Sequence, residues 1–223
     1  MSLTVTQAIR QRHSARAFLD RPVELSTIQT ILDTARFAPS GVNTQPWQVA
    51  VVTGETKQQL QNAFLAEFKE GNRGQMDYSY YPDEWHPPYK QRRVTTGKQL
   101  YGALKIERQD KERQKAQWAA NYRAFDAPVM LIFLIDQSLN TGSYFDYGMF
   151  VQNIMLLAEE AGLATCPQGA LGEYPQIIRQ QLDYDENKLI LGGMAIGYED
   201  TNHPVNQYRT EREAIENFTK FFA

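Results

Sequence analysis

The segment PVMLIFLID at 128–136 most constrains the fold, because it is apolar at nearly every position. A strand with one face in water alternates apolar and polar side chains, whereas a strand buried on both faces has no such alternation. This segment therefore predicts a central strand that other elements cover on both sides. NKLILGGMAIGY at 187–198 has the same character and predicts a second central strand.

Helical patterns surround these two strands. Thr4 and Ser26 each begin a sequence with the form of a capping box, which predicts two helix starts. The second helix must end before Pro39, because proline cannot continue a helix. The remaining predicted helices span 55–70, 97–124, 143–161, 174–182 and 210–223, and the remaining predicted strands span 47–53 and 163–166. These elements indicate one α+β domain over residues 1–223.

Some of these helices have predicted apolar faces. In the helix at 97–124, Leu100, Leu104 and Trp118 are expected to point inward. In the last helix, Ile215, Phe218 and Phe222 form the expected apolar stripe.

The stretch from 71 to 96 breaks the regular pattern. It holds four tyrosines, one tryptophan and three prolines, so it favours an ordered functional loop over a disordered one. Tyr78, Tyr81 and Trp85 are candidate walls of a pocket for a flat substrate. Packing at an interface or a surface flap explains the same aromatic residues equally well.

Composition excludes several classes of protein. A formal charge of −3 and a pI near 5.7 argue against a nucleic-acid partner, which calls for a basic face. The apolar runs are too short for a membrane helix or a signal peptide. Cys166 is the only cysteine, so an internal disulfide is excluded and a cytoplasmic location is expected.

Motifs for familiar side-chain chemistry are missing. There is no GxGxxG, GxxxxGK[ST], GxSxG or HExxH, and the three histidines lack metal-ligand spacing, so no metal site is predicted. A lone cysteine is more often a small buried hydrophobe than a nucleophile, which is the preferred interpretation of Cys166. An enzyme with this sequence would need a cofactor to carry the chemistry.

Two arginine-rich segments could bind an anion. RQRHSAR at 10–16 supplies guanidinium groups and a hydroxyl, which suit a phosphate, although a solvated charged face would look the same. Arg209 and Arg212 offer two more guanidinium groups near the other end of the chain. Their spacing does not show whether the two segments meet.

Five blocks of sequence together carry a resemblance. They are RHSARAF, APSGVNTQPW, NYRAFDAPV, GLATCPQGAL and GYEDTNHPVNQYRTERE, in this order. They closely resemble the FMN-dependent nitroreductase family, and LYGALKIERQDKERQ resembles its nitrobenzoate and nitroaromatic reductase subgroup. The resemblance implies a central, mostly antiparallel sheet flanked by helices. It also implies an intertwined homodimer with FMN at the interface.

The resemblance also implies where FMN binds. The positions that match Arg12 and Ser14 reach the phosphate and ribityl chain, and the position that matches Arg16 lies near the pyrimidine edge of the flavin. The APSGVN loop reaches a flavin held mainly by the other subunit. The expected cofactor-binding residues are Arg12, His13, Ser14, Arg16, Pro39, Ser40, Gly41, Asn43, Asn121, Pro167, Gln168, Gly169, Arg209 and Arg212. Ala124 stands where some relatives carry a lysine, so flavin potential and substrate range are expected to differ from theirs.

The implied function is that of an oxidoreductase in which NADH or NADPH reduces the flavin at N5 and a nitroarene or quinone then oxidises it. No side chain is expected to act as a catalytic acid or base. Two alternatives stay open. One is a flavoenzyme of the same fold with other chemistry, such as a dehalogenase, a flavin-modifying enzyme or a dehydrogenase. The other is a non-catalytic dimer that binds flavin.

Overall fold

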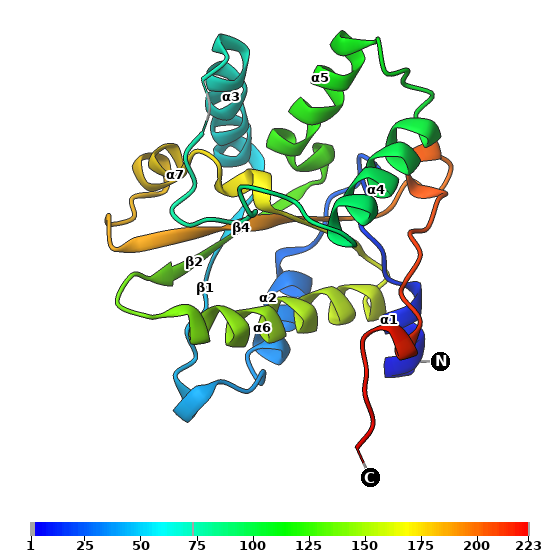
Figure 1. Cartoon of the computed structure of the whole chain (residues 1–223). Helices are drawn as coiled ribbons and strands as arrows, with labels where there is room; N and C mark the ends of the chain where they lie inside the picture. Colours follow the sequence, from blue (N-terminus) through cyan, green and yellow to red (C-terminus); the bar gives the residue numbers. More distant parts are fainter. Residues whose placement is uncertain (1–2, 73, 223) are drawn as a thin grey trace.

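The centre of the molecule is one antiparallel sheet of four strands in the order β1-β2-β4-β3 (Figure 1). The computed structural model describes residues 3–72 and 74–222. The strands are β1 (Gln48–Val52), β2 (Val129–Asp136), β3 (Ala164–Gln168) and β4 (Lys188–Gly197). The two apolar segments predicted to be central strands are therefore neighbours in the middle of the sheet, and the α+β prediction is confirmed.

Strand β2 lacks alternation because each of its faces packs into a separate hydrophobic core. Val129, Leu131, Phe133 and Ile135 belong to one cluster, together with residues of α2 and α6. Met130, Ile132 and Leu134 belong to another cluster, together with residues of α3 and α7. Burying such side chains contributes about 1.5–3 kcal/mol each, so both faces must be covered.

The helices form a layer on each face of the sheet (Figure 1). On one face lie α1 (Val5–Gln11), α2 (Leu25–Ala35) and α6 (Thr141–Glu160). The other face carries α3 (Gly54–Glu70), α7 (Pro175–Leu182) and the 3₁₀ segment η2 (Ala120–Asp126). Among residues 3–72 and 74–222, no helix is long and apolar enough to cross a bilayer.

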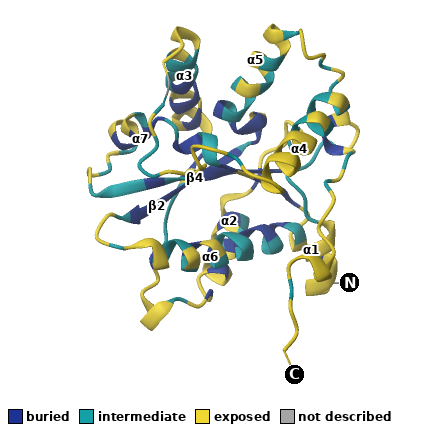
Figure 2. Cartoon of the chain, in the orientation of Figure 1, coloured by how far each residue is buried: buried dark blue, intermediate teal, exposed yellow. Residues whose placement is uncertain are grey.

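Two helices stand away from the cores. These are α4 (Tyr89–Ala103) and α5 (Lys111–Ala119), whose residues are all exposed or only partly buried (Figure 2). The sequence predicted one helix over 97–124, and this prediction is wrong. The helix breaks where Lys105 adopts a positive φ of 50°. Asp110 then caps α5 by accepting a hydrogen bond from the Arg113 amide at 3.1 Å.

Several smaller expectations also change. The irregular stretch predicted to end at 96 ends at Pro88, since α4 begins at Tyr89. Trp118 is 46% exposed, so it does not point inward as expected. The Thr4 capping box is confirmed, whereas α2 begins at Leu25 without a side-chain cap instead of at a Ser26 box.

The predicted helix over 210–223 is wrong. The described part of this segment contains only the 3₁₀ turn η5 (Ile215–Asn217). Ile215, Phe218 and Phe222 are 51%, 71% and 91% exposed. A short helix is marginal in water unless its apolar face packs against something, and these three side chains stay mostly exposed in the described part of the chain.

Strand β4 contains a bulge that later positions the site. Phe133 pairs with Gly192 and Leu134 pairs with Ile190, so Leu191 is the extra residue. A Cβ added at Gly193 would lie 2.4 Å from the Leu131 carbonyl oxygen and 2.7 Å from the Leu171 side chain. Glycine at this position lets η3 (Gly169–Gly172) lie directly on the sheet.

Replacing Gly193 tests this close packing. Gly193→Ala should lower the free energy of unfolding by about 1–3 kcal/mol, because backbone and core side chains must shift. Gly102→Ala is the matched control in α4, where an added Cβ meets nothing within 4 Å. The control should raise stability by up to about 1 kcal/mol through helix propensity. Urea unfolding measures both, and equal stabilities would contradict the packing described for η3.

Candidate functional site

The segment after α1 is an extra, irregular edge of the sheet. Ser14 forms a parallel bridge with Thr165 of β3, and the Ala15 amide donates to the Thr165 carbonyl at 3.0 Å. The Leu19 amide donates to the Tyr198 carbonyl at 2.8 Å. This pairing fixes the RHSAR segment beside the end of β3, where PQG begins.

The Asn206 side chain also holds this segment, through hydrogen bonds to its backbone. This side chain is 2% exposed, and its Oδ1 accepts from the Arg16 amide at 2.8 Å. Its Nδ2 donates to the carbonyls of Ala17 and Asp200 at 2.8 and 2.9 Å. The Arg16 guanidinium donates to the Ser14 carbonyl at 3.2 Å. Asn206 therefore holds the backbone that carries Arg16, a role that no sequence motif revealed.

A first cavity, here called the basic cavity, opens next to this segment. Its volume is about 500 Å³. Its wall brings together four separate parts of the chain: the N-terminal segment, η2, the end of β3, and the aromatic stretch with α4. The lining includes Arg16, Asn121, Cys166, Pro167, Gln168, Gly169, Tyr80, Tyr81, Arg93 and Trp118. Five residues from the predicted cofactor-binding set thus meet at one place.

Gln168 is buried in the wall of the basic cavity and is only partly satisfied. Its Nε2 donates to the Asn121 carbonyl at 3.0 Å, and it is 6% exposed. Its Oε1 is buried and has no hydrogen-bond donor among the described residues. Buried polar atoms are nearly always paired, so such an atom marks a place where a ligand can donate.

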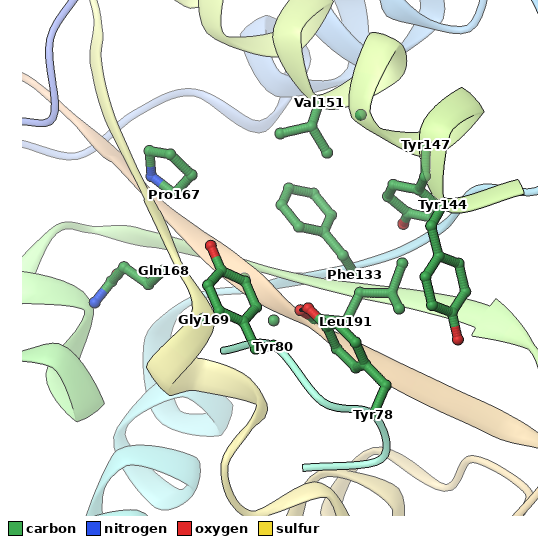
Figure 3. Close-up of a pocket in the computed structure, with 13 residues that line it drawn as sticks. Tyr78, Tyr80, Phe133, Tyr144, Tyr147, Val151, Pro167, Gln168, Gly169 and Leu191 are labelled. Carbon is green, nitrogen blue, oxygen red and sulfur yellow. Dashed lines mark hydrogen bonds between the residues drawn. The ribbon is translucent and has the colours of Figure 1, made fainter. Parts of the chain in front are cut away.

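A second cavity of about 310 Å³, here called the tyrosine cavity, lies beside the first. Tyr78, Tyr144 and Tyr147 line it together with Phe133, Val151 and Leu191 (Figure 3). Both cavities share Tyr80 and the strip 167–169. A Cβ at Gly169 would lie 3.2 Å from the Tyr80 ring, so glycine allows this tyrosine to sit close to the strip.

Burial favours the neutral form of three ionisable side chains in these walls, Tyr78, Tyr147 and Cys166. Burial raises the pKa of Tyr78 and of Tyr147 above the ordinary tyrosine value. Burial also raises the pKa of the Cys166 thiol, and Cys166 is 2% exposed. A thiol that is buried and protonated is a poor nucleophile, which agrees with its predicted structural role.

The predicted pocket residues separate in the structure. Tyr78 lines the tyrosine cavity and Tyr81 lines the basic cavity. Trp85 is in the lining of neither cavity as described. Its ring instead lies 5.6 Å from that of Tyr81 and 5.4 Å from the Arg93 guanidinium carbon, so it supports the wall from behind.

The arginines from the two ends of the chain lie close enough for their charges to interact. The pKa of Arg12 is lowered, first by burial and then by the positive charge of Arg212. The buried Nε of Arg12 has no acceptor within the described part of the chain. Like charges brought together in this way favour an anion between them.

Three other residues predicted to contact the cofactor, His13, Arg209 and Arg212, bond to groups of this same chain. His13 Nε2 lies 2.8 Å from Glu199 Oε1, so the ring is paired with a carboxylate. Arg209 donates to the Asn206 carbonyl at 2.6 Å, and Arg212 donates to the Thr210 hydroxyl at 2.8 Å. The His13–Glu199 pair joins the RHSAR segment to the chain after β4, whereas the two arginine bonds lie within the C-terminal segment.

The APSGVN loop lies elsewhere. It contains the 3₁₀ turn η1 (Gly41–Asn43) and projects beyond α6, on the face of the sheet opposite η2 (Figure 1). The Gly41 amide donates to Asp146 of α6 at 3.0 Å, and Ser40 accepts from the Gln45 amide at 2.9 Å. Pro39, Ser40, Gly41 and Asn43 do not contribute to the described lining of either cavity.

Sequence analysis missed Asn206, Arg93 and Tyr208 as site residues. Tyr208 accepts a hydrogen bond from Arg16 at 3.3 Å. Arg93 lies on an exposed helix, and only its position over the cavity distinguishes it from other surface arginines. Within residues 3–72 and 74–222, no group of three or more His, Cys, Asp or Glu side chains is placed to hold a metal ion.

Comparisons with known proteins agree with this geometry. The model of the nitroreductase family matches residues 9–198. A chloronitrobenzene nitroreductase of Comamonas testosteroni is 37% identical over 97% of this chain and 96% of its own. A 4-nitrobenzoate reductase of Pseudomonas putida is 38% identical over 96% of this chain and 93% of its own.

A solved structure gives the same result. The FMN and NADPH-dependent nitroreductase NfnB from sphigopyxis sp. strain HMH superposes with a TM-score of 0.96 at 38% identity, over 99% of this chain and all of that one. The family match covers most of the chain, and the relatives align along nearly their whole length. The resemblance noted in the sequence is therefore confirmed, and the chain belongs to the nitroreductase family.

Proposed function

We propose that this protein is an FMN-dependent oxidoreductase that uses NADH or NADPH to reduce nitroaromatic compounds or quinones. The observation that carries the proposal is the basic cavity, which joins Arg16 and the unpaired Gln168 Oε1 to an aromatic wall. The names of the relatives support the same function, since they describe nitroreductases of nitroaromatic compounds and an FMN and NADPH-dependent enzyme.

The residues present suit FMN. Arg12 and Arg212 would hold the phosphate, because the charge of Arg212 acts on the partly buried Arg12, whose Nε has no acceptor among the described residues. Arg16 and Asn121 would hold the polar edge of the ring, and Gln168 Oε1 would accept a hydrogen bond from it. Ser14, Pro167 and Gly169 would line the path between these two ends.

Bound FMN would supply hydride and electron transfer, which no side chain of the site provides. The chain's own contribution is electrostatic and steric. Arg16 would place a positive charge beside the polar edge of the bound ring and so stabilise negative charge there. Tyr80 and the tyrosine cavity offer flat apolar surfaces, against which a nicotinamide or nitroarene ring can stack in turn.

The APSGVN loop contributes through a partner. Since the loop lies apart from both cavities of its own chain, it would reach a flavin only in a second copy of the chain. Pro39, Ser40, Gly41 and Asn43 would then complete the partner's site in a homodimer. His13 and Arg209 would support the site by fixing the neighbouring backbone and Glu199.

Turnover tests the proposed function directly. The purified, yellow protein should oxidise NADH or NADPH when a nitrobenzoate or a simple quinone is added. Steady-state rates with both nicotinamides against both acceptors measure this. Flavin binding without turnover would favour a non-catalytic flavin protein, and turnover confined to halogenated phenols would favour a dehalogenase of the same fold.

Arg16 should be needed to hold the cofactor. Arg16→Ala should weaken FMN binding by about 10- to 100-fold, because a charge-assisted hydrogen bond is worth about 1.5–3 kcal/mol. Quenching of flavin fluorescence on titration measures the affinity. Arg108→Ala, an exposed arginine between α4 and α5, is the control and should bind like the parent. Unchanged affinity and unchanged flavin reduction in Arg16→Ala would contradict the assigned role.

The protein should retain FMN only as long as it is a dimer. On dilution, the fraction of bound FMN should fall together with the fraction of dimer, because each site is completed by the partner's loop. Analytical ultracentrifugation monitored in the flavin absorption band measures both quantities together. A stable monomer that retains FMN would show that the loop has been misplaced in this proposal.

A further inference from the structure

The aromatic stretch after α3 is fixed to strand β4 by two consecutive residues. Asp77 Oδ2 accepts a hydrogen bond from the Ile190 amide at 2.7 Å. The Tyr78 hydroxyl donates to the Leu191 carbonyl at 2.8 Å. These two bonds fall on the bulge, where Leu191 is the extra residue of β4.

The edge of β4 has room for this attachment because β3 is short. Pairing between β3 and β4 ends at Gln168 and Gly193. Backbone groups of β4 before Gly193 must therefore find other partners, since buried amides and carbonyls are rarely left unpaired. Asp77 and Tyr78 supply one acceptor and one donor, so the aromatic stretch takes the place of an edge strand.

A buried ion pair fixes Asp77 itself. Arg179 of α7 donates from Nη2 to Asp77 Oδ1 at 2.7 Å. The two side chains are 5% and 12% exposed. Burying a charged pair is costly and often adds little stability, so such pairs are better explained by the geometry they impose. Here both oxygens of the Asp77 carboxylate accept hydrogen bonds, one from Arg179 of α7 and one from the Ile190 amide of β4.

Aromatic contacts connect the residue after Asp77 with the rest of the cavity wall. The Tyr78 ring lies 6.0 Å from Tyr80 and 5.6 Å from Tyr144 of α6. The Tyr80 ring lies 4.6 Å from Tyr81. Tyr78, Tyr80 and Tyr81 thus lie close after Asp77 in the sequence, and between them they line both cavities.

We propose that Asp77, held by Arg179, is a positioning residue that fixes the tyrosine wall on the β4 bulge and thereby determines which aromatic acceptors fit. The inference rests on the proposed function, since it concerns the acceptor of that reaction. Asp77 would touch neither cofactor nor acceptor. Its effect would reach the acceptor through Tyr78, Tyr80 and Tyr81.

Two variants test this role. Asp77→Asn keeps the size of the side chain and removes its charge, and Tyr78→Phe removes only the hydroxyl on Leu191. Asp136→Asn is the matched control, because it breaks the Asp136–Lys188 pair (2.8 Å) two residues before Ile190 on β4, and neither residue lines either cavity as described. Each holoprotein is assayed for KM and kcat with a nitrobenzoate, for FMN affinity, and for chymotrypsin cleavage within 78–85.

Asp77→Asn should raise the acceptor KM by about tenfold, and Tyr78→Phe by about threefold, with kcat and FMN affinity within about twofold of the parent. Cleavage within 78–85 should accelerate in the same order. The control should leave KM and cleavage unchanged. If Asp77→Asn does not fold, Tyr78→Phe alone decides the question.

Two results would overturn the proposal. One is faster cleavage in a folded variant whose acceptor KM is unchanged, which would make the anchor purely structural. The other is an equal loss in the Asp136→Asn control. Failure of the proposed function is distinguishable, because the parent protein itself would then not reduce the nitrobenzoate.

Discussion

The arrangement of the site depends on how strand β4 is covered. Its apolar faces require a layer of structure on each side, and its two edges require hydrogen-bond partners. Strand β2 satisfies one edge along its whole length, whereas β3 satisfies the other edge only as far as Gly193. At this point the edge of β4 stops pairing with β3 and bonds to Asp77 and Tyr78 instead. The bulge allows this, as does Gly192, which has a φ of 134° and lies close to the Gln168 carbonyl. Both cavities open where that change occurs, along the strip 167–169.

Backbone contacts bring the two ends of the chain close together, although the charges of their arginines repel. Burial and the positive charge of Arg212 both lower the pKa of Arg12, so the two arginines repel each other. Such an arrangement persists because the backbone around it is fixed independently, by Asn206 and by the pairing of residues 14–19 with the sheet. The unfavourable interaction is thus held in place by favourable ones nearby, as is common at binding sites.

Local pattern was sufficient to predict the central strands and most helices, and five of the residues named through the resemblance line the basic cavity. Features that depend on long-range packing were not predictable. The break at Lys105 arises from a helix that packs poorly, and the helix expected near the C-terminus lacks a surface to bury its phenylalanines. Asn206 looks like any loop asparagine until its three backbone partners are seen. The ion pair of Asp77 and Arg179 joins residues about a hundred positions apart and leaves no local signal.

The APSGVN loop shows how polar residues can preset a shape for a partner. Val42, Asn43 and Gln45 all have positive φ, a conformation that costs energy in residues other than glycine. Ser40 and Asp146 offset this cost through hydrogen bonds to backbone amides within the same chain. The loop is therefore ordered before any association, and less conformational entropy is lost when a second chain meets it. The hydrogen bonds made by Ser40 and Asp146 thus fix the loop's own shape, which is what a contact between two copies of the chain would require.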